Sequence, residues 1–453
     1  MSVFDNVMKF VETSVAPVAG KISAQKHVNA IKDGFVSTMP FLIVGSLLLV
    51  LAFPPSEGNF FFDGWHSLIK AIGQENILAP FQLSMGIFAL YATFGIGFSL
   101  AESYKLRPMN TGMLCMFAFM LAAAPMTNTE IGGVIPGAYL GGAGAFTAIM
   151  CGLFVPEMQR MLIKYNIRIK MPEAVPPKIS ASFDLLIPIV VISVIIMPIN
   201  IMLSQYDLQI PSAVMKLFQP LVMASDTYIA CLIAVLLVQL LWFSGIHGGS
   251  VVGGIIAPML LINLGLNQEA LAAGEPLPAI FVNPVMDFFV FVGGAGGTWG
   301  LVVLMMRSKA TQLKAIGKMS IIPGTFNINE PVIFGTPIVM NPVYFIPWLL
   351  APAVNTTIVW MAFKTGFVAK IIAIPPWTMP APVGAIIATN SGTAALVVLS
   401  SIIVSATIFY PFLKVHEKQL IAEEKAALEA TAAANKGKVP AAVKDGELNE
   451  CRN

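Results

Sequence analysis

The stretch FNINEPVIFG, Phe326–Gly335, places a single carboxylate in apolar surroundings. From Ser320 to Phe363, Glu330 is the only Asp, Glu, Lys, Arg or His side chain. Placing an acidic side chain at the centre of a membrane costs at least about 2.5 kcal/mol of insertion free energy, so such a residue needs a partner or a function. Because Pro331 disfavours helix at the preceding residue, we expect a non-helical hairpin that presents Glu330 to a cavity.

A second stretch, LWFSGIHGGS at Leu241–Ser250, ends an apolar run with a lone histidine. Glycines break the helix around His247, and we count Gly248 among the candidate binding residues. An imidazole can donate to or accept from a ligand hydroxyl, and it can pair with Glu330. Trp242 can stack on an apolar ring face, although a place in the aromatic belt at the membrane surface explains it equally well.

A third stretch, PPWTMPAPVGAIIATN at Pro375–Asn390, contains four prolines and no charge. This pattern predicts another broken segment that lines a cavity, with Trp377 as a stacking platform or as an aromatic-belt residue. Asn390 and Asn283 are further candidate partners for a ligand hydroxyl. We interpret Asp287, near Asn283, as an interfacial or structural acid.

The composition indicates a membrane protein. The 453 residues are 57% hydrophobic and only 11% charged, whereas soluble domains carry about 25% charged residues. A net charge of +2 without a basic, aromatic-interleaved surface argues against a nucleic-acid partner. The four cysteines form no CxxC or Cys/His cluster, and no GxSxG, HExxH or Walker sequence is present, so we expect no metal, no cofactor and no soluble-enzyme chemistry.

Long apolar segments predict the fold, since a transmembrane helix needs about 20 apolar residues. Candidate spans lie at about 34–53, 79–101, 110–126, 137–155, 183–204, 226–246, 281–306, 342–362 and 393–413. Shorter Gly- and Pro-interrupted pieces lie at about 250–266, 320–340 and 371–390. Such pieces line binding sites in transporters. We therefore predict an all-α polytopic membrane protein with roughly ten transmembrane helices plus re-entrant hairpins.

The placement of Lys and Arg predicts the orientation, because short basic loops stay in the cytoplasm. Basic residues gather in the leading segment and in the loops around Lys105, 160–178 and 307–318. The other loops of the first half are acidic or nearly neutral. We expect the N- and C-termini to be cytoplasmic.

Amphipathic patterns predict helices that lie on the membrane surface. Residues 3–12 place their apolar side chains on one helical face. Arg160, Lys164 and Arg168 form a basic stripe beside apolar residues, again typical of an interfacial helix. The charged, Ala-rich tail from Lys414 is expected to be helical at first and then disordered.

Five motifs in this order resemble a known family. They are HVNAIKDGF (His27–Phe35), GIHG (Gly245–Gly248), INEPVIFG (Ile328–Gly335), PIVMNP (Pro337–Pro342) and PWTMP (Pro376–Pro380). The chain resembles enzyme IIC, the membrane subunit of the bacterial phosphoenolpyruvate-dependent sugar phosphotransferase system. The most similar branch is that for lactose, cellobiose and diacetylchitobiose.

The resemblance implies a homodimeric permease in the bacterial cytoplasmic (inner) membrane. Residues 1–205 would form the dimerising scaffold, 206–415 the sugar-binding transport half with re-entrant hairpins, and 416–453 a charged cytoplasmic tail. The substrate would be a β-linked disaccharide, with cellobiose favoured, then diacetylchitobiose, then lactose. Its 6-hydroxyl would be phosphorylated by the phosphocysteine of a separate IIB protein. A IIA protein would be a further partner, acting through IIB.

The resemblance also assigns roles. Glu330 and His247 would contact the sugar, with Glu330 beside the reacting hydroxyl, while Asn329, Trp242 and Trp377 help to hold it. The docking residues for IIB are our own hypothesis: we expect them in the basic loops 160–178 and 307–318. The alternative is a proton-coupled secondary sugar transporter, in which Glu330 and His247 form a proton relay.

Overall fold

The computed structural model describes residues 24–54, 60–130, 132–167, 169 and 183–436, together with Lys9, Thr13, Pro17 and Lys21. Within these residues the chain is mostly helical, as predicted. The strands described are two short ones, β1 (Thr127–Thr129) and β2 (Gly132–Val134), which pair antiparallel in one hairpin.

The first half is built mainly from long helices. Up to residue 204 the helices are α3 (Lys26–Ala52), α4 (Phe60–Ile72), α5 (Gln74–Gln82), α6 (Phe88–Ser103), α7 (Pro108–Ala123), η2 (Gly142–Gly144), α8 (Ala145–Lys164) and α10 (Leu186–Ser204). Helix α3 begins where the Gln25 side chain accepts a hydrogen bond from the Val28 N–H at 2.7 Å. Such a cap satisfies a donor that has no partner within the helix.

The second half alternates long helices with short ones. Its helices are α11 (Ile210–Ser225), α12 (Tyr228–Phe243), α13 (Gly248–Ala273), η3 (Met286–Val290), α14 (Trp299–Met306), α15 (Thr311–Thr325), α16 (Glu330–Gly335), α17 (Pro342–Lys364), α18 (Ala381–Thr389) and α19 (Thr393–Lys436). Chain reversals separate the short helices, and these reversals surround the candidate site described below.

Six of the described helices are long and apolar enough to cross a membrane. They are Lys26–Ala52, Gly142–Lys164, Leu186–Ser204, Gly248–Ala273, Pro342–Lys364 and Thr393–Glu429. Helices α11 and α12 form a further candidate span bent by 69°. The chain is thus a multi-pass membrane protein, and the predicted count of about ten crossings stays a prediction.

Three predicted segments differ from the structure. The predicted span 79–101 is interrupted by a turn at residues 83–87, between α5 and α6. The piece at about 250–266, predicted to be short and interrupted, belongs to the 26-residue helix α13 despite its glycines and Pro258. The predicted span 281–306 is not one helix. Its Gly-rich centre is a loop in which Gly293, Gly294, Gly296 and Gly297 have φ values between 67° and 99°, and only glycine adopts such values readily.

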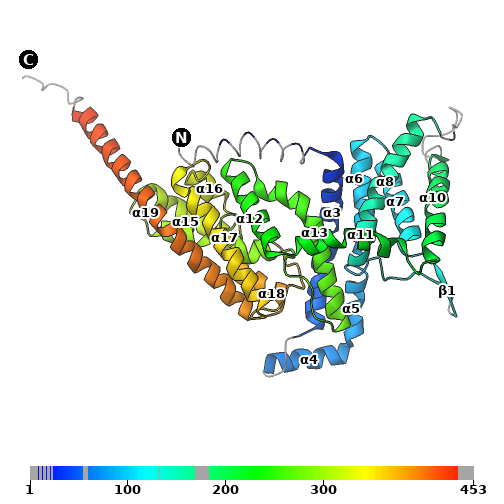
Figure 1. Ribbon diagram of the computed structural model, residues 1–453. Coiled ribbons are helices and arrows are strands. Elements are labelled where there is room, and N and C mark those ends of the chain that lie inside the picture. The colour runs from blue at the N-terminus through cyan, green and yellow to red at the C-terminus, as the bar shows by residue number, and fades with distance from the viewer. Residues whose placement is uncertain are drawn as a thin grey trace, which may run out of the picture.

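Figure 1 shows an elongated molecule whose two halves meet in the middle. Helices α7, α8 and α10 lie at one end, and α12 and α15–α19 lie at the other, with α3 and α13 between them. Helix α13 packs against both α3 and η2. One buried core therefore runs from α3 and α6 into the second half, while a smaller one stays between α6, α7, α8 and α10.

Three of the predicted surface features have different outcomes. The amphipathic segment 3–12 and Arg168 lie outside the described residues. Arg160 and Lys164 belong to the last turns of α8 rather than to a separate interfacial helix, because the helix continues unbroken through them. The tail is helical through Lys436, and its remaining residues lie outside the described part of the chain.

Candidate functional site

A cavity of about 390 Å³ lies among the broken elements of the second half. The ends of α12 and α13, η3, the Gly-rich loop, the α15–α16 turn and the loop at residue 377 all contribute to its wall. Six of the predicted site residues line it: Glu330, His247, Asn329, Trp242, Trp377 and Asn283. The structure therefore brings together side chains that lie up to 135 residues apart in the sequence (from Trp242 to Trp377).

Glu330 lies at the start of a helix, not in a non-helical hairpin as the sequence predicted. It is the first residue of α16, and Pro331 occupies the first turn. A proline is tolerated there because its missing N–H would have no partner in the helix anyway. The carboxylate is exposed at the cavity and makes no hydrogen bond or ion pair with the other described residues. It is therefore available to accept hydrogen bonds from a ligand.

His247 has its ring fixed by the start of α13, which it caps. Its Nδ1 accepts from the Ser250 backbone N–H at 3.0 Å and lies 2.9 Å from the Ser250 Oγ. A neutral ring that accepts at Nδ1 carries its proton on Nε2, which leaves one N–H for a ligand. The predicted pairing with Glu330 is not found among the described contacts, so a bound ligand would have to bridge the two side chains.

The two tryptophans differ in how they reach the cavity. Trp242 is buried, and its ring centroid lies 4.3 Å from that of His247. Trp377 is 57% exposed and offers a broad free face. Its loop is tied to the α15–α16 turn by Asn327, whose Nδ2 donates to the Trp377 carbonyl at 2.8 Å. An aromatic platform is thus positioned by a polar side chain that sequence reasoning missed.

Asn329 holds the wall of the cavity together. Its Nδ2 donates to the Ala295 carbonyl at 2.6 Å and to the Thr298 Oγ1 at 2.9 Å, which fixes the Gly-rich loop against the Glu330 turn. Gly294 is required there, because a Cβ on it would lie 2.3 Å from the Asn329 Cγ. This loop was predicted to pack helices closely, whereas it forms the cavity surface beside Asn329.

Two predicted binding residues are placed elsewhere. Gly248 is packed against α12, where a Cβ would lie 2.1 Å from the Val238 carbonyl oxygen. Asn390 has a left-handed conformation at the end of α18, and its Nδ2 donates to the Phe53 carbonyl at 2.6 Å. Both residues therefore have packing or capping contacts, and neither lines this cavity.

Asp287, predicted to be an interfacial or structural acid, also lines the cavity. It lies in the π-helical turn η3, four residues after Asn283, so both side chains reach the same wall. In the sequence, the clue to this shared wall was that Asn283 and Asp287 lie only four residues apart, next to Pro284. The cavity thus holds two carboxylates, an imidazole, amides and indoles, which suits an uncharged ring with hydroxyl groups and apolar faces.

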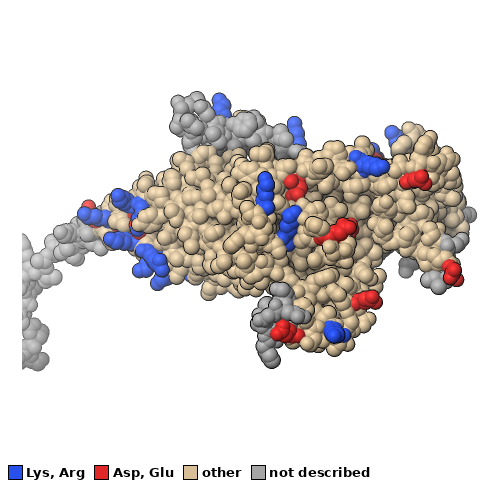
Figure 2. Space-filling model, turned by 60° about the horizontal axis from the view of Figure 1, so that its bottom comes forward, with Lys and Arg blue, Asp and Glu red and all other residues tan. Residues whose placement is uncertain are grey.

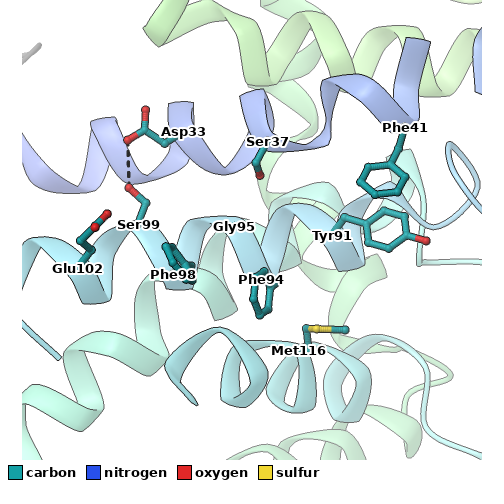
Figure 3. Close-up of a pocket in the computed structure, with 10 residues that line it drawn as sticks. All are labelled: Asp33, Ser37, Phe41, Tyr91, Phe94, Gly95, Phe98, Ser99, Glu102 and Met116. Atoms are coloured by element: carbon teal, nitrogen blue, oxygen red, sulfur yellow. Dashed lines mark hydrogen bonds between the residues drawn. The ribbon is translucent and has the colours of Figure 1, made fainter. Parts of the chain in front are cut away.

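A second, larger pocket of about 680 Å³ lies between α3, α6 and α7 of the first half (Figure 3). Aromatic rings form much of its wall, and Phe41 and Tyr91 stack at 4.7 Å. Its Asp33 is already engaged, since it accepts from Ser99 Oγ at 3.0 Å and lies 3.5 Å from the Lys32 Nζ. Its other acid, Glu102, is exposed, but within the described part of the chain no imidazole, amide or indole lines this pocket as in the smaller cavity. No cluster able to hold a metal ion is found among the described residues.

The family model for the phosphotransferase system, EIIC, matches residues 32–352. This chain belongs to that family. It is 34% identical to the PTS system cellobiose-specific EIIC component of Geobacillus stearothermophilus, over 93% of this chain and 97% of the relative. It is 35% identical to the lichenan permease IIC component of Bacillus subtilis (strain 168), over 93% and 96%.

A solved structure extends the similarity to three dimensions. The fold matches the transporter ChbC, the IIC component from the N,N'-diacetylchitobiose-specific phosphotransferase system, with a TM-score of 0.83 and 35% identity. The match covers 92% of this chain and 99% of that one. The chain is therefore an EIIC sugar permease of the cellobiose/lactose group, and EIIC proteins work with IIB and IIA components.

Proposed function

We propose that this EIIC chain takes up a β-linked disaccharide and presents its 6-hydroxyl to the phosphocysteine of a separate IIB protein. Cellobiose is the favoured sugar, followed by diacetylchitobiose and lactose. The observation that carries the proposal is the cavity in which Glu330 is unpartnered among the described residues and lies with His247, two indoles and two amides. Its volume of about 390 Å³ lies within the usual range for small-molecule sites, about 300–1,000 Å³.

The side chains divide the work of binding and reaction. The Nε2–H of His247 donates to a sugar oxygen, while Trp242 and Trp377 pack on the apolar faces of the rings. Glu330 accepts from the 6-hydroxyl, orients it and takes its proton as the oxygen attacks phosphorus. The new O–P bond forms as the P–S bond of the phosphocysteine breaks, a transfer that depends mainly on positioning.

We further propose that residues 1–205 form the scaffold of a homodimer, and that 206–415 carry the sugar. Large apolar side chains on α3 and α7, such as Val36, Phe41 and Met113, are exposed and available to a second copy or to lipid. Both termini lie on the cytoplasmic side in this proposal, together with the tail 416–453. Cross-linking of cysteines introduced on α3 in native membranes tests the dimer.

Vesicle assays test the main proposal. Membrane vesicles that contain the chain should accumulate phosphorylated disaccharide only when phosphorylated IIB is supplied. Uptake driven by a pH gradient without IIB would contradict it and favour the proton-coupled alternative. That alternative has little structural support, because His247 and Glu330 make no direct contact that could relay a proton.

A further inference from the structure

Helix α19 does not end where the membrane-spanning part of the chain should end. It runs for 44 residues and projects from the body of the molecule (Figure 1). From Lys414 onward it lies beside the start of α15 and the loop 307–310 that precedes it. The extension is attached at two points, one on this loop and one on the first turn of α15.

Two acids of α19 are turned inward at this junction. Glu417 is 4% exposed; its Oε1 accepts from the Ser308 Oγ at 2.7 Å and the Lys309 N–H at 2.6 Å, and its Oε2 accepts from the Lys414 Nζ at 2.6 Å. The Oε1 of Glu424 accepts from the Thr311 N–H at 2.8 Å. The N-cap residue of α15, Ala310, has only a methyl side chain, which cannot accept a hydrogen bond. Glu424 of α19 therefore caps the start of α15.

The cations of the same region are turned outward. The exposed ones, which we call the α15–α19 basic face, are Arg307, Lys309, Lys314, Lys318 and Lys418. Figure 2 shows several Lys and Arg side chains gathered at the end of the molecule from which α19 projects, while most of the Asp and Glu side chains in that view lie elsewhere. With Glu417 and Glu424 engaged internally, Glu423 is the nearby acid left exposed and the face is positive.

This face is connected directly to the candidate site. Helix α15 has 15 residues, so it spans about 22 Å from the basic face to the turn that ends at Glu330. Near its end the Trp299 Nε1–H donates to the Thr325 Oγ1 at 3.3 Å, which ties α15 to α14. A partner bound to the basic face would thus contact the same helix, α15, that leads into the turn carrying Glu330.

We propose that the α15–α19 basic face is the docking surface for phosphorylated IIB. This inference rests on the proposed function, which requires a doubly anionic phosphoryl group to approach Glu330. A positive face at the other end of α15 from this site attracts such a donor and orients it. The attachment of α19 to the α15 cap favours a protein partner over lipid, because it builds a two-helix surface that a membrane alone does not need.

The test measures IIB binding and sugar phosphorylation on the full-length chain. Lys314→Glu/Lys318→Glu reverses two exposed charges of the basic face, and Lys105→Glu/Lys216→Glu is the control on two exposed lysines outside both candidate docking loops. The Lys314→Glu/Lys318→Glu variant should bind phosphorylated IIB about tenfold more weakly, and its binding should depend less on salt concentration. It should raise the KM for that donor equally, leaving sugar affinity unchanged. The control should bind the donor normally.

Each outcome has one reading. Unchanged binding of phosphorylated IIB to Lys314→Glu/Lys318→Glu overturns the inference. An equal loss of IIB binding in the control variant also overturns it. A loss seen only in vesicles with anionic lipid, and absent in neutral detergent, assigns these lysines to the membrane and also overturns it. Lys314→Gln/Lys318→Gln should give a smaller loss if the charge matters. A wild-type chain that binds the donor but phosphorylates no sugar would instead refute the proposed function.

Discussion

The two halves of the molecule both pack helices closely at glycines, but the run of loop-forming glycines lies in the second half. In the first half, glycines let helices touch: a Cβ on Gly34 of α3 would lie 2.6 Å from the Ile96 backbone nitrogen of α6. In the second half, Gly293, Gly294, Gly296 and Gly297 have positive φ and break a membrane-depth segment into a loop. The first pattern makes a close-packed scaffold, and the second gives polar side chains access to a cavity.

The two pockets follow the same division. The larger pocket lies on regular helices, and its acid Asp33 is already engaged by Ser99 and Lys32. The smaller cavity lies where helices start and stop, and Glu330 is left free there among the described residues. Both pockets have an exposed acid in their lining, Glu102 or Glu330, but only the smaller one places its acid with an imidazole, amides and indoles.

The largest contrast between the pockets should come from their carboxylates. Glu330→Gln should keep sugar affinity within a few fold but lower sugar phosphorylation at least about a hundredfold, because the proton acceptor is lost. Glu102→Gln, in the larger pocket, is the matched control and should phosphorylate normally. The measurement is transfer of labelled phosphoryl from IIB to sugar in vesicles. Normal transfer in Glu330→Gln would remove this residue from the mechanism.

The next contrast compares the two kinds of glycine. In Gly294→Ala the new Cβ meets Asn329 at a φ of 99°, so the strain, about 2 kcal/mol, should weaken sugar binding about thirtyfold. Gly34→Ala should instead destabilise the α3–α6 contact by about 1–3 kcal/mol and leave sugar affinity unchanged. Calorimetric sugar titration and thermal unfolding separate the two effects. A reversed pattern would mean that the halves do not divide these roles.

Sequence reasoning located much of the fold, and its errors have physical causes. Long apolar runs such as 342–362 correspond to single helices even with Pro347 and Pro352 inside, because a helix satisfies its backbone groups within one segment at membrane depth. Predictions based on glycine were wrong in two opposite ways. Glycine predicted a break within α13, where packing overrides its low helix propensity, and it suggested close helix packing at 291–300, where four positive φ values form a loop.

The candidate site was predictable where a side chain was unusual for its surroundings. A lone acid and a lone histidine in apolar runs identified Glu330 and His247, and both line the cavity. Asn390 was a poor candidate, because asparagine is also a common left-handed helix cap and only the fold shows its bond to Phe53. Asn327 was missed because its role depends on two loops that meet only in three dimensions.

A smaller effect should separate the two functions of His247, ligand contact and helix cap. His247→Ala removes both, and sugar affinity should fall about tenfold. His247→Asn keeps a side-chain acceptor for the Ser250 N–H, so α13 should keep its cap while the ligand contact is lost. Equal loss of affinity in both variants, with normal stability in the second, supports direct contact. Full affinity in His247→Asn would show that capping alone matters.

The smallest expected effect is at Trp377, whose exposed face offers stacking without a hydrogen bond. Trp377→Ala should weaken sugar binding about fivefold, since one stacked ring is worth about 1 kcal/mol, and Trp377→Phe should recover most of the loss. Trp65→Ala, in α4 of the first half, is the control and should bind sugar normally. If Trp377→Phe binds as weakly as the alanine variant, a flat ring is not what this position supplies. The second half would then hold its ligand by polar contacts from Glu330, His247 and their neighbours.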